Sequence, residues 1–213
     1  MIIDSITEAI GRTPILRIDG QIHGLKNIDL YAKLEYLNPF GSLKDRTAYG
    51  LLQDEIDYIK EHGLTVIETS SGNTAKALQS ICNINGIRFR TITNRIRVSE
   101  SRSIIKYLGA DILEVSKDVN TIERIEEIIA ADHGKYFHTA QYSNNNNVKA
   151  HYETGREIYE DAGSIDYLFS VLGTSGSSRG ITMYLKEKNP DLVSVVLFPR
   201  MIVIYPEFVH WQR

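Results

Sequence analysis

The sequence is poor in cysteine, in net charge and in long apolar runs. A single cysteine, Cys82, cannot form an internal disulfide, so the protein is compatible with a reducing compartment. The place of Cys82 in a helical pattern predicts that it is a small side chain of the core. The formal net charge of −3 argues against coating of nucleic acid or a membrane surface. No apolar run approaches membrane-spanning length, and the N-terminus lacks the regions of a signal peptide. We therefore expect a cytoplasmic protein.

Several common catalytic and metal-binding motifs are also missing. The 6 histidines show no metal-ligand spacing, and with one cysteine we expect no metal site. There is no Gly-x-Ser-x-Gly elbow of a serine hydrolase. There is also no Walker A motif and no Gly-x-Gly dinucleotide fingerprint. Any chemistry must therefore come from other loops.

The hydrophobic pattern predicts strands that alternate with single helices. The expected strands cover residues 29–35, 65–68, 87–93, 111–115, 136–140, 165–172 and 192–198, and the expected helices include 45–60 and 121–131. Strands joined by single helices form right-handed βαβ units, so we predict an α/β fold of mostly parallel twisted sheets with helices on both faces. Ligands of such sheets bind at the carboxyl ends of the strands.

The stretch from Asn38 to Arg46 joins a predicted strand to a predicted helix, and Lys44 lies at the junction. The positive end of the helix dipole and the neighbouring Arg46 both disfavour an ammonium there. A lysine kept partly neutral in this way is a nucleophile towards an aldehyde. The alternative is a solvated lysine in a turn.

Two further loops follow predicted strands and open predicted helices. The first is Ser70–Thr74 and the second is Gly173–Ser178. Backbone N–H groups of small residues at a helix N-terminus, together with hydroxyl groups, suit a carboxylate or a phosphate. The alternatives are a helix N-cap for the first loop and a flexible connector for the second. An aldehyde-ready lysine with two anion-binding loops is what pyridoxal phosphate and an amino acid require together.

The sequence resembles the cysteine synthase and cystathionine β-synthase family of pyridoxal-phosphate-dependent enzymes, which have fold type II. Four ordered segments carry the resemblance, which we expect to end near Pro199. They are residues 10–15 (IGRTPI), 33–46 (KLEYLNPFGSLKDR), 69–74 (TSSGNT) and 173–177 (GTSGS).

The resemblance implies a role for each matching residue. Lys44 resembles the Schiff-base lysine, which is both catalytic and cofactor-binding, and Asn73 resembles the residue that bonds the 3′ oxygen of the cofactor. The residues that resemble the substrate-carboxylate site are Ser70, Ser71, Thr74 and Gln141. The phosphate loop is matched by Gly173, Thr174, Ser175, Gly176 and Ser177, in which Ser175 and Ser177 replace the commoner glycine and threonine.

The implied activity is a β-replacement on an O-activated L-serine through an aminoacrylate, with pyridoxal 5'-phosphate as the cofactor and a homodimer as the assembly. One alternative keeps this chemistry but uses an amine nucleophile, as in diaminopropionate synthesis. Another is a truncated, non-catalytic remnant that binds an anion or a partner. Ala75 and Lys76 follow Thr74 where the family usually continues with glycine, which leaves the substrate preference open.

The resemblance also implies a division into domains. We expect a smaller substrate-side domain over about 46–150 and an incomplete larger cofactor domain built from 1–45 and 151–199, followed by an atypical tail over 200–213. The family continues beyond this point and there supplies the residue that faces the pyridine nitrogen. We therefore expect a C-terminal truncation, for instance by a frameshift just after Pro199. The alternative is a natural strand that covers a sheet edge or pairs with a partner.

Overall fold

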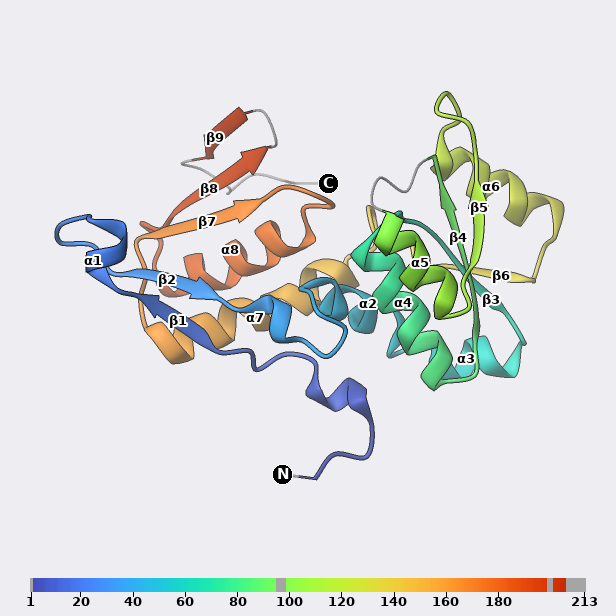
Figure 1. The fold of residues 1–213 in the computed structure, drawn as a ribbon, viewed down its shortest axis with the longest axis horizontal. Helices are drawn as coiled ribbons and strands as arrows, with labels where there is room; N and C mark the ends of the chain where they lie inside the picture. Colours follow the sequence, from blue (N-terminus) through green and yellow to red (C-terminus); the bar gives the residue numbers. More distant parts are fainter. Residues whose placement is uncertain (1, 95–98, 199–200, 206–213) are drawn as a thin grey trace. The chain divides into compact units, whose positions relative to one another are not determined.

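The computed structural model describes residues 2–94, 99–198 and 201–205, with the backbone alone for 198 and 201–205 (Figure 1). The chain divides into two compact units. The first comprises Met1–Ile10 and Tyr36–Asn146, and the second comprises Gly11–Glu35 and Asn147–Arg213. The domain boundaries expected from the sequence stay a prediction. No helix of the described residues is long and apolar enough to cross a membrane.

The first unit is built on a parallel sheet. Its strands are β3 (Thr65–Thr69), β4 (Arg88–Thr93), β5 (Asp111–Glu114) and β6 (Tyr136–His138), in the order β5-β4-β3-β6. Every neighbouring pair in this sheet is parallel. Its helices are η1 (Ile6–Ala9), α2 (Lys44–Leu52), α3 (Ile56–Glu61), α4 (Asn73–Ile84), α5 (Ser99–Tyr107) and α6 (Thr121–Ala131), while η2 (Glu35–Leu37) lies at the boundary between the units.

The central strand β3 is buried on both of its faces. Val66 belongs to a core that includes Leu78 of α4, whereas Ile67 belongs to a second core that includes Ile125 of α6. Successive side chains of a strand point to opposite faces, so α4 and α6 cover opposite sides of the sheet. Figure 1 shows α4 and α5 on one side of these strands and α6 on the other. The predicted α/β fold with helices on both faces is confirmed.

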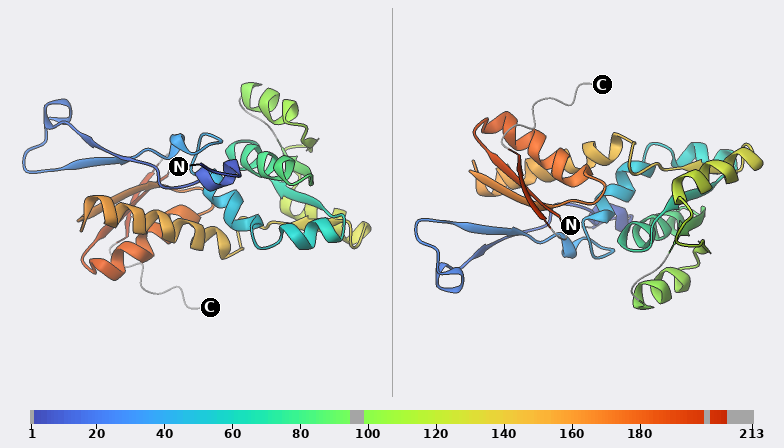
Figure 2. Two further views of the ribbon diagram at one scale, coloured as in Figure 1. Left: turned by 90° about the horizontal axis from the view of Figure 1, so that it is seen from below. Right: turned by 90° about the horizontal axis from the view of Figure 1, so that it is seen from above.

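The second unit contains two smaller sheets. Strands β1 (Ile15–Ile18) and β2 (Leu30–Lys33) form an antiparallel hairpin, and the short helix α1 (Gly20–His23) lies at its end (Figure 2). The other sheet has the order β7-β8-β9, from Tyr167–Val171, Val193–Phe198 and Met201–Tyr205. The β7–β8 pair is parallel and the β8–β9 pair is antiparallel. The unit also holds α7 (Asn146–Ala162) and α8 (Gly176–Lys188).

Strand β9 bears on the alternatives for the C-terminal tail. It pairs with the side of β8 that is not paired with β7. This is the arrangement expected of a natural strand that covers the edge of the sheet. Residues 206–213 of the expected tail lie outside the described residues.

Glycine lets α7 and α8 approach closely. A Cβ atom on Gly180 would lie 2.3 Å from the carbonyl oxygen of Val148, and one on Gly155 would lie 2.8 Å from Cβ of Tyr184. Real Cβ contacts are longer than this, so these two positions accept only hydrogen at the present helix spacing.

A buried ion pair joins the hairpin to α7. Lys33 Nζ lies 2.8 Å from Glu157 Oε2, and the two side chains are only 10% and 11% exposed. Lys33 also donates a hydrogen bond to the carbonyl oxygen of Thr13. The other carboxylate oxygen of Glu157 accepts the backbone N–H of Arg12 at 2.9 Å. The pair therefore fixes the segment that precedes β1.

The prediction of a single helix over 45–60 was wrong. The structure has two helices there, α2 and α3, separated by residues 53–55. The N–H of Glu55 bonds to the carbonyl of Leu52, three residues back, so the α-helical ladder is interrupted. The separating residues, Gln53, Asp54 and Glu55, include neither glycine nor proline, so the sequence carries no signal for the break.

Candidate functional site

Lys44 is the first residue of α2, and its side chain is half-buried. Its backbone N–H donates to the hydroxyl of Ser42 at 3.2 Å. Burial lowers the pKa of the Lys44 ammonium below its ordinary value. The direction agrees with the expectation from the sequence, and its physical cause is desolvation of the ammonium. A lysine that loses its proton more easily is better suited to attack an aldehyde.

The turn before Lys44 is held by the buried carboxylate of Asp45. Asp45 Oδ2 accepts the N–H of Phe40 at 2.6 Å, and Oδ1 lies 3.4 Å from the hydroxyl of Ser42. The residue is 0% exposed, and burial raises the pKa of its carboxyl group to about 6. From the sequence we assign no role to Asp45. The available signal was an acidic residue in the first turn of a helix.

The first turn of α4 lies against this same turn. A Cβ atom on Gly41, where φ is 85°, would lie 3.5 Å from Lys76 Nζ. The Lys76 ammonium lowers the pKa of Asp45, although less strongly than burial raises it. Lys76, one of the two residues that depart from the family pattern, therefore sits beside the turn that carries Lys44.

The Ser70–Thr74 loop connects β3 to α4. Ser70 Oγ accepts the N–H groups of Gly72 at 3.3 Å and Ala75 at 3.1 Å, so it satisfies one free N–H group in the first turn of α4, although the N-cap residue itself is Gly72. The carbonyl oxygen of Ser70 accepts the hydroxyl of Thr91 at 2.6 Å. Thr74 is buried, Ser71 is half-buried and Asn73 is exposed. Their contacts with cofactor and substrate stay predictions.

Gln141 follows β6 and is bonded to the end of β3. Its side-chain Nε2 donates to the carbonyl oxygen of Thr69 at 2.7 Å, and its backbone N–H donates to Glu68 Oε2 at 2.9 Å. The residue is only 3% exposed. The structure thus brings Gln141 next to the start of the Ser70–Thr74 loop.

The loop at Gly173–Ser177 connects β7 to α8 in the second unit. Ser175 has φ 63°, in the left-handed region, and its hydroxyl donates to the carbonyl oxygen of Thr174 at 2.6 Å. The hydroxyl of Ser178 donates to the carbonyl oxygen of Ser175 at 3.1 Å. Serine therefore occupies a backbone conformation that glycine adopts at lower cost.

Asn147 supports this loop from α7. Its Nδ2 donates to Thr174 Oγ1 at 2.9 Å, and a Cβ atom on Gly176 would lie 2.2 Å from its Oδ1. Asn147 is only 2% exposed. From the sequence we assign no role to Asn147, because the sequence does not reveal which residue packs behind the loop.

The residues of the loop fit a phosphate group. The loop opens α8, which has 13 residues, so the positive end of the helix dipole lies at the loop. A Cβ atom on Gly173 would meet nothing within 4 Å, and the two residues that follow it, Thr174 and Ser175, carry small side chains with hydroxyl groups. Lys44, Ser70–Thr74 and Gln141 lie in the first unit and Gly173–Ser177 in the second. Strands β3 and β6 belong to one sheet and β7 belongs to another, so these loops do not share the edge of a single sheet. Their convergence on one site stays a prediction.

Comparison with known proteins identifies the family. A family model described as "Pyridoxal-phosphate dependent enzyme" matches residues 6–210. The chain belongs to this family. Pyridoxal phosphate is accordingly the family's cofactor. The match extends beyond Pro199, so our expectation that the resemblance ends there was wrong.

Relatives of this chain include cysteine synthases. The chain is 33% identical to cystathionine beta-synthase of Apis mellifera over 219 residues, which cover 96% of this chain and 42% of the relative. It is 32% identical to cysteine synthase B of Pseudomonas aeruginosa, over 98% of this chain and 71% of the relative. The crystal structure of cysteine synthase from Entamoeba histolytica superposes with a TM-score of 0.81 at 32% identity, covering 90% of this chain and 59% of that one. The chain therefore spans less than half of the first relative.

We predict that Ser175→Gly stabilises the protein. Glycine removes the steric cost of the left-handed conformation, and we expect a gain of about 0.5–1 kcal/mol in the free energy of unfolding, measured by urea denaturation. Ser177→Gly is the matched control. Ser177 lies inside α8, so glycine there should lower stability by about 0.5 kcal/mol. Destabilisation by Ser175→Gly would contradict the strain argument.

We further predict a pH-dependent stability that depends on Asp45. A carboxyl group whose pKa is raised from 3.8 to about 6 on folding contributes stability that is full below pH 3.8 and is lost as the pH rises through 6. In urea titrations between pH 4 and 7, the free energy of unfolding of wild type should fall on the order of 2 kcal/mol more than that of Asp45→Asn. The contributions of the other titrating groups are the same in both proteins and cancel in this difference. Asp57→Asn, at an exposed position of α3, is the control, and its unfolding free energy should depend on pH as that of wild type does. The prediction is refuted if the curve of unfolding free energy against pH for Asp45→Asn runs parallel to the wild-type curve.

Proposed function

We propose that the protein catalyses a pyridoxal-phosphate-dependent β-replacement on an O-activated L-serine, as a cysteine synthase does. The observation that carries the proposal is Lys44, a half-buried lysine of lowered pKa at the first residue of α2, in a chain that belongs to this cofactor family. The activity remains a proposal because the chain spans only 42% of the first relative and 59% of the Entamoeba enzyme.

Each part of the proposed site has a defined task. The bound cofactor would supply an electron sink for the charge that develops at the substrate Cα. Lys44 would hold the cofactor's aldehyde carbon through its Nζ atom and would move the Cα proton, which requires an amine that is neutral for part of the time. Its burial supports this role.

The remaining residues would hold the cofactor and the substrate in place. Asn73 would bond the 3′ oxygen of the cofactor. The loop Gly173–Ser177 would hold the phosphate with hydroxyl groups and the N-terminus of α8. The substrate carboxylate would bind to the residues Ser70, Ser71, Thr74 and Gln141. We also propose a homodimer and a cytoplasmic location, as expected from the sequence.

We predict that Lys44 carries the cofactor. Reconstitution of the full 213-residue chain with pyridoxal phosphate should produce a visible absorbance band in wild type and none in Lys44→Ala, because covalent attachment of the aldehyde requires that amine. Borohydride reduction followed by peptide mapping should then place the label on the peptide that contains Lys44.

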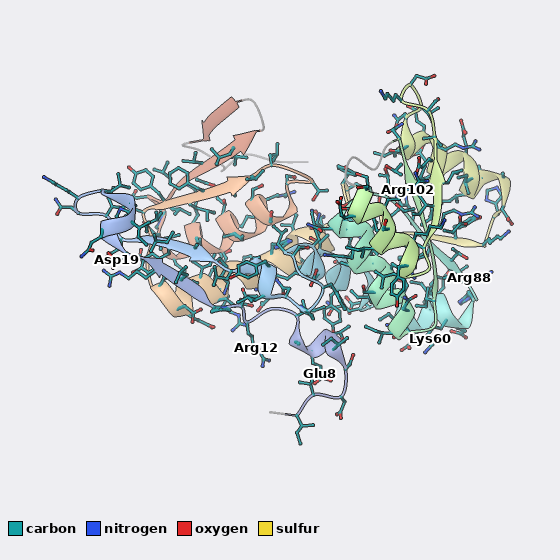
Figure 3. The ribbon with its side chains drawn as sticks, in the orientation of Figure 1. Glu8, Arg12, Asp19, Lys60, Arg88 and Arg102 are labelled. Atoms are coloured by element: carbon teal, nitrogen blue, oxygen red, sulfur yellow. The ribbon has the colours of Figure 1, made fainter. Side chains whose placement is uncertain are left out.

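Lys60→Ala is the matched control for this experiment. Lys60 is exposed on α3 and points away from the core of the first unit (Figure 3). The control variant should therefore keep both the band and the labelled peptide. A band that persists in Lys44→Ala would overturn the assignment, and a colourless wild type would favour the remnant over the enzyme.

Product analysis identifies the nucleophile. The reconstituted protein is given an O-activated L-serine together with either sulfide or an amine donor. Formation of cysteine with sulfide supports the proposed reaction, whereas a diamino acid formed only with the amine donor assigns the alternative with an amine nucleophile.

A further inference from the structure

Glu68 is a carboxylate in the interior of the first unit that the proposed reaction does not use. It lies near the end of the central strand β3 and is 0% exposed. Burying a carboxylate is costly unless its oxygens accept several hydrogen bonds. An apolar residue at this position would continue the buried core of β3 without the cost of desolvating a carboxylate, so the charged residue needs an explanation.

Both carboxylate oxygens of Glu68 accept hydrogen bonds. Oε1 accepts the N–H of Thr69 at 2.7 Å. Oε2 accepts the hydroxyl of Thr139 at 2.6 Å and the N–H of Gln141 at 2.9 Å. His138 Nε2 lies 3.7 Å from Oε1. Burial raises the pKa of the Glu68 carboxyl, but His138 and the hydrogen bonds together lower it further, so the net shift is downward.

These bonds lie where the regular sheet ends. Strand β6 ends at His138, yet Thr139 and Gln141 remain attached to β3 through the Glu68 carboxylate. Between them Ala140 has φ 51°, an unfavourable conformation for a residue with a Cβ atom. Such a conformation persists only where surrounding contacts hold it.

The groups held in this way are those that the proposed site uses. Gln141 is fixed by its backbone to Glu68 and by its side chain to Thr69. Ser70 follows Thr69 in the sequence, and its carbonyl oxygen accepts the hydroxyl of Thr91 of β4. The loops that follow β3 and β6 are thus joined through Glu68 and the end of β3.

We propose that Glu68 is a positioning residue that sets the geometry of Gln141 and of the Ser70–Thr74 loop for binding the substrate carboxylate. This inference rests on the proposed function. Glu68 is not a catalytic residue, because it is fully buried and both of its oxygens are occupied by donors of the protein itself.

The first test uses the full chain without cofactor. Glu68→Gln keeps the shape of the side chain but replaces one acceptor oxygen by an NH₂ donor and the other by a neutral amide oxygen, which accepts more weakly than a carboxylate. Hydrogen exchange at the Gln141 amide should therefore accelerate by about tenfold or more. Glu114→Gln is the matched control. Glu114 ends the parallel strand β5 and pairs with Arg102 on the surface at 2.7 Å, so exchange at Gln141 should not change. Unchanged exchange in Glu68→Gln would overturn the proposal.

The second test measures turnover of the reconstituted protein. KM for the O-activated serine should rise about tenfold or more in Glu68→Gln, while kcat and the cofactor absorbance stay within about threefold of wild type. A purely structural role would lower the unfolding midpoint and leave KM unchanged, which would overturn the proposal. If Glu68→Gln fails to fold, Thr139→Val removes one donor to the same oxygen and should change exchange and KM in the same direction.

A wild-type protein that shows no cofactor absorbance and no turnover would count against the proposed function. The amide-exchange comparison does not need the cofactor. It therefore decides in either case whether Glu68 holds Gln141, and the failure of one idea remains distinguishable from the failure of the other.

Discussion

The candidate site in the first unit depends on the burial of β3 on both faces. Val66 and Ile67 pack into two different cores, so a shift of the strand by one residue would move each side chain into the opposite core, among other packing partners. This fixed register determines where β3 ends and therefore where Glu68, Thr69 and Ser70 lie. The Ser70–Thr74 loop is irregular, but the strand from which it emerges is packed on both faces.

Much of this fold could be predicted because the apolar pattern and the packing agree. The helix predicted over 121–131 is α6 with the same bounds, and Asn120 caps it by accepting the N–H of Ile122. The strand predicted over 136–140 is shorter, Tyr136–His138. The N–H of Thr139 still donates to the carbonyl oxygen of Ile67 on β3, but Ala140 has φ 51° and leaves the extended conformation. Apolar side chains indicated the strand, but nothing in the local sequence indicated that Thr139 bonds to a carboxylate 71 positions away.

The sequence indicates the residues of the candidate site whose chemistry is local, and it does not indicate those whose role depends on burial. Lys44 follows from a strand, a turn and a helix that adjoin in the sequence. Asp45 and Glu68 were missed because charged residues usually lie at the surface, and no spacing indicates that these two are 0% exposed. The pair between Lys33 and Glu157 was missed for a related reason, since its members are far apart along the chain.

The crossing of α7 and α8 shows how a position can be intolerant of change without taking part in chemistry. Gly180 meets the carbonyl oxygen of Val148, and Gly155 lies 3.0 Å from the carbonyl oxygen of Ile181 in addition to Cβ of Tyr184. A side chain in the way can be exchanged for a smaller one during evolution, but a peptide carbonyl cannot. A mutational survey of this protein would therefore find both glycines as invariant as any reactive residue, although their only task is to leave room for the neighbouring main chain.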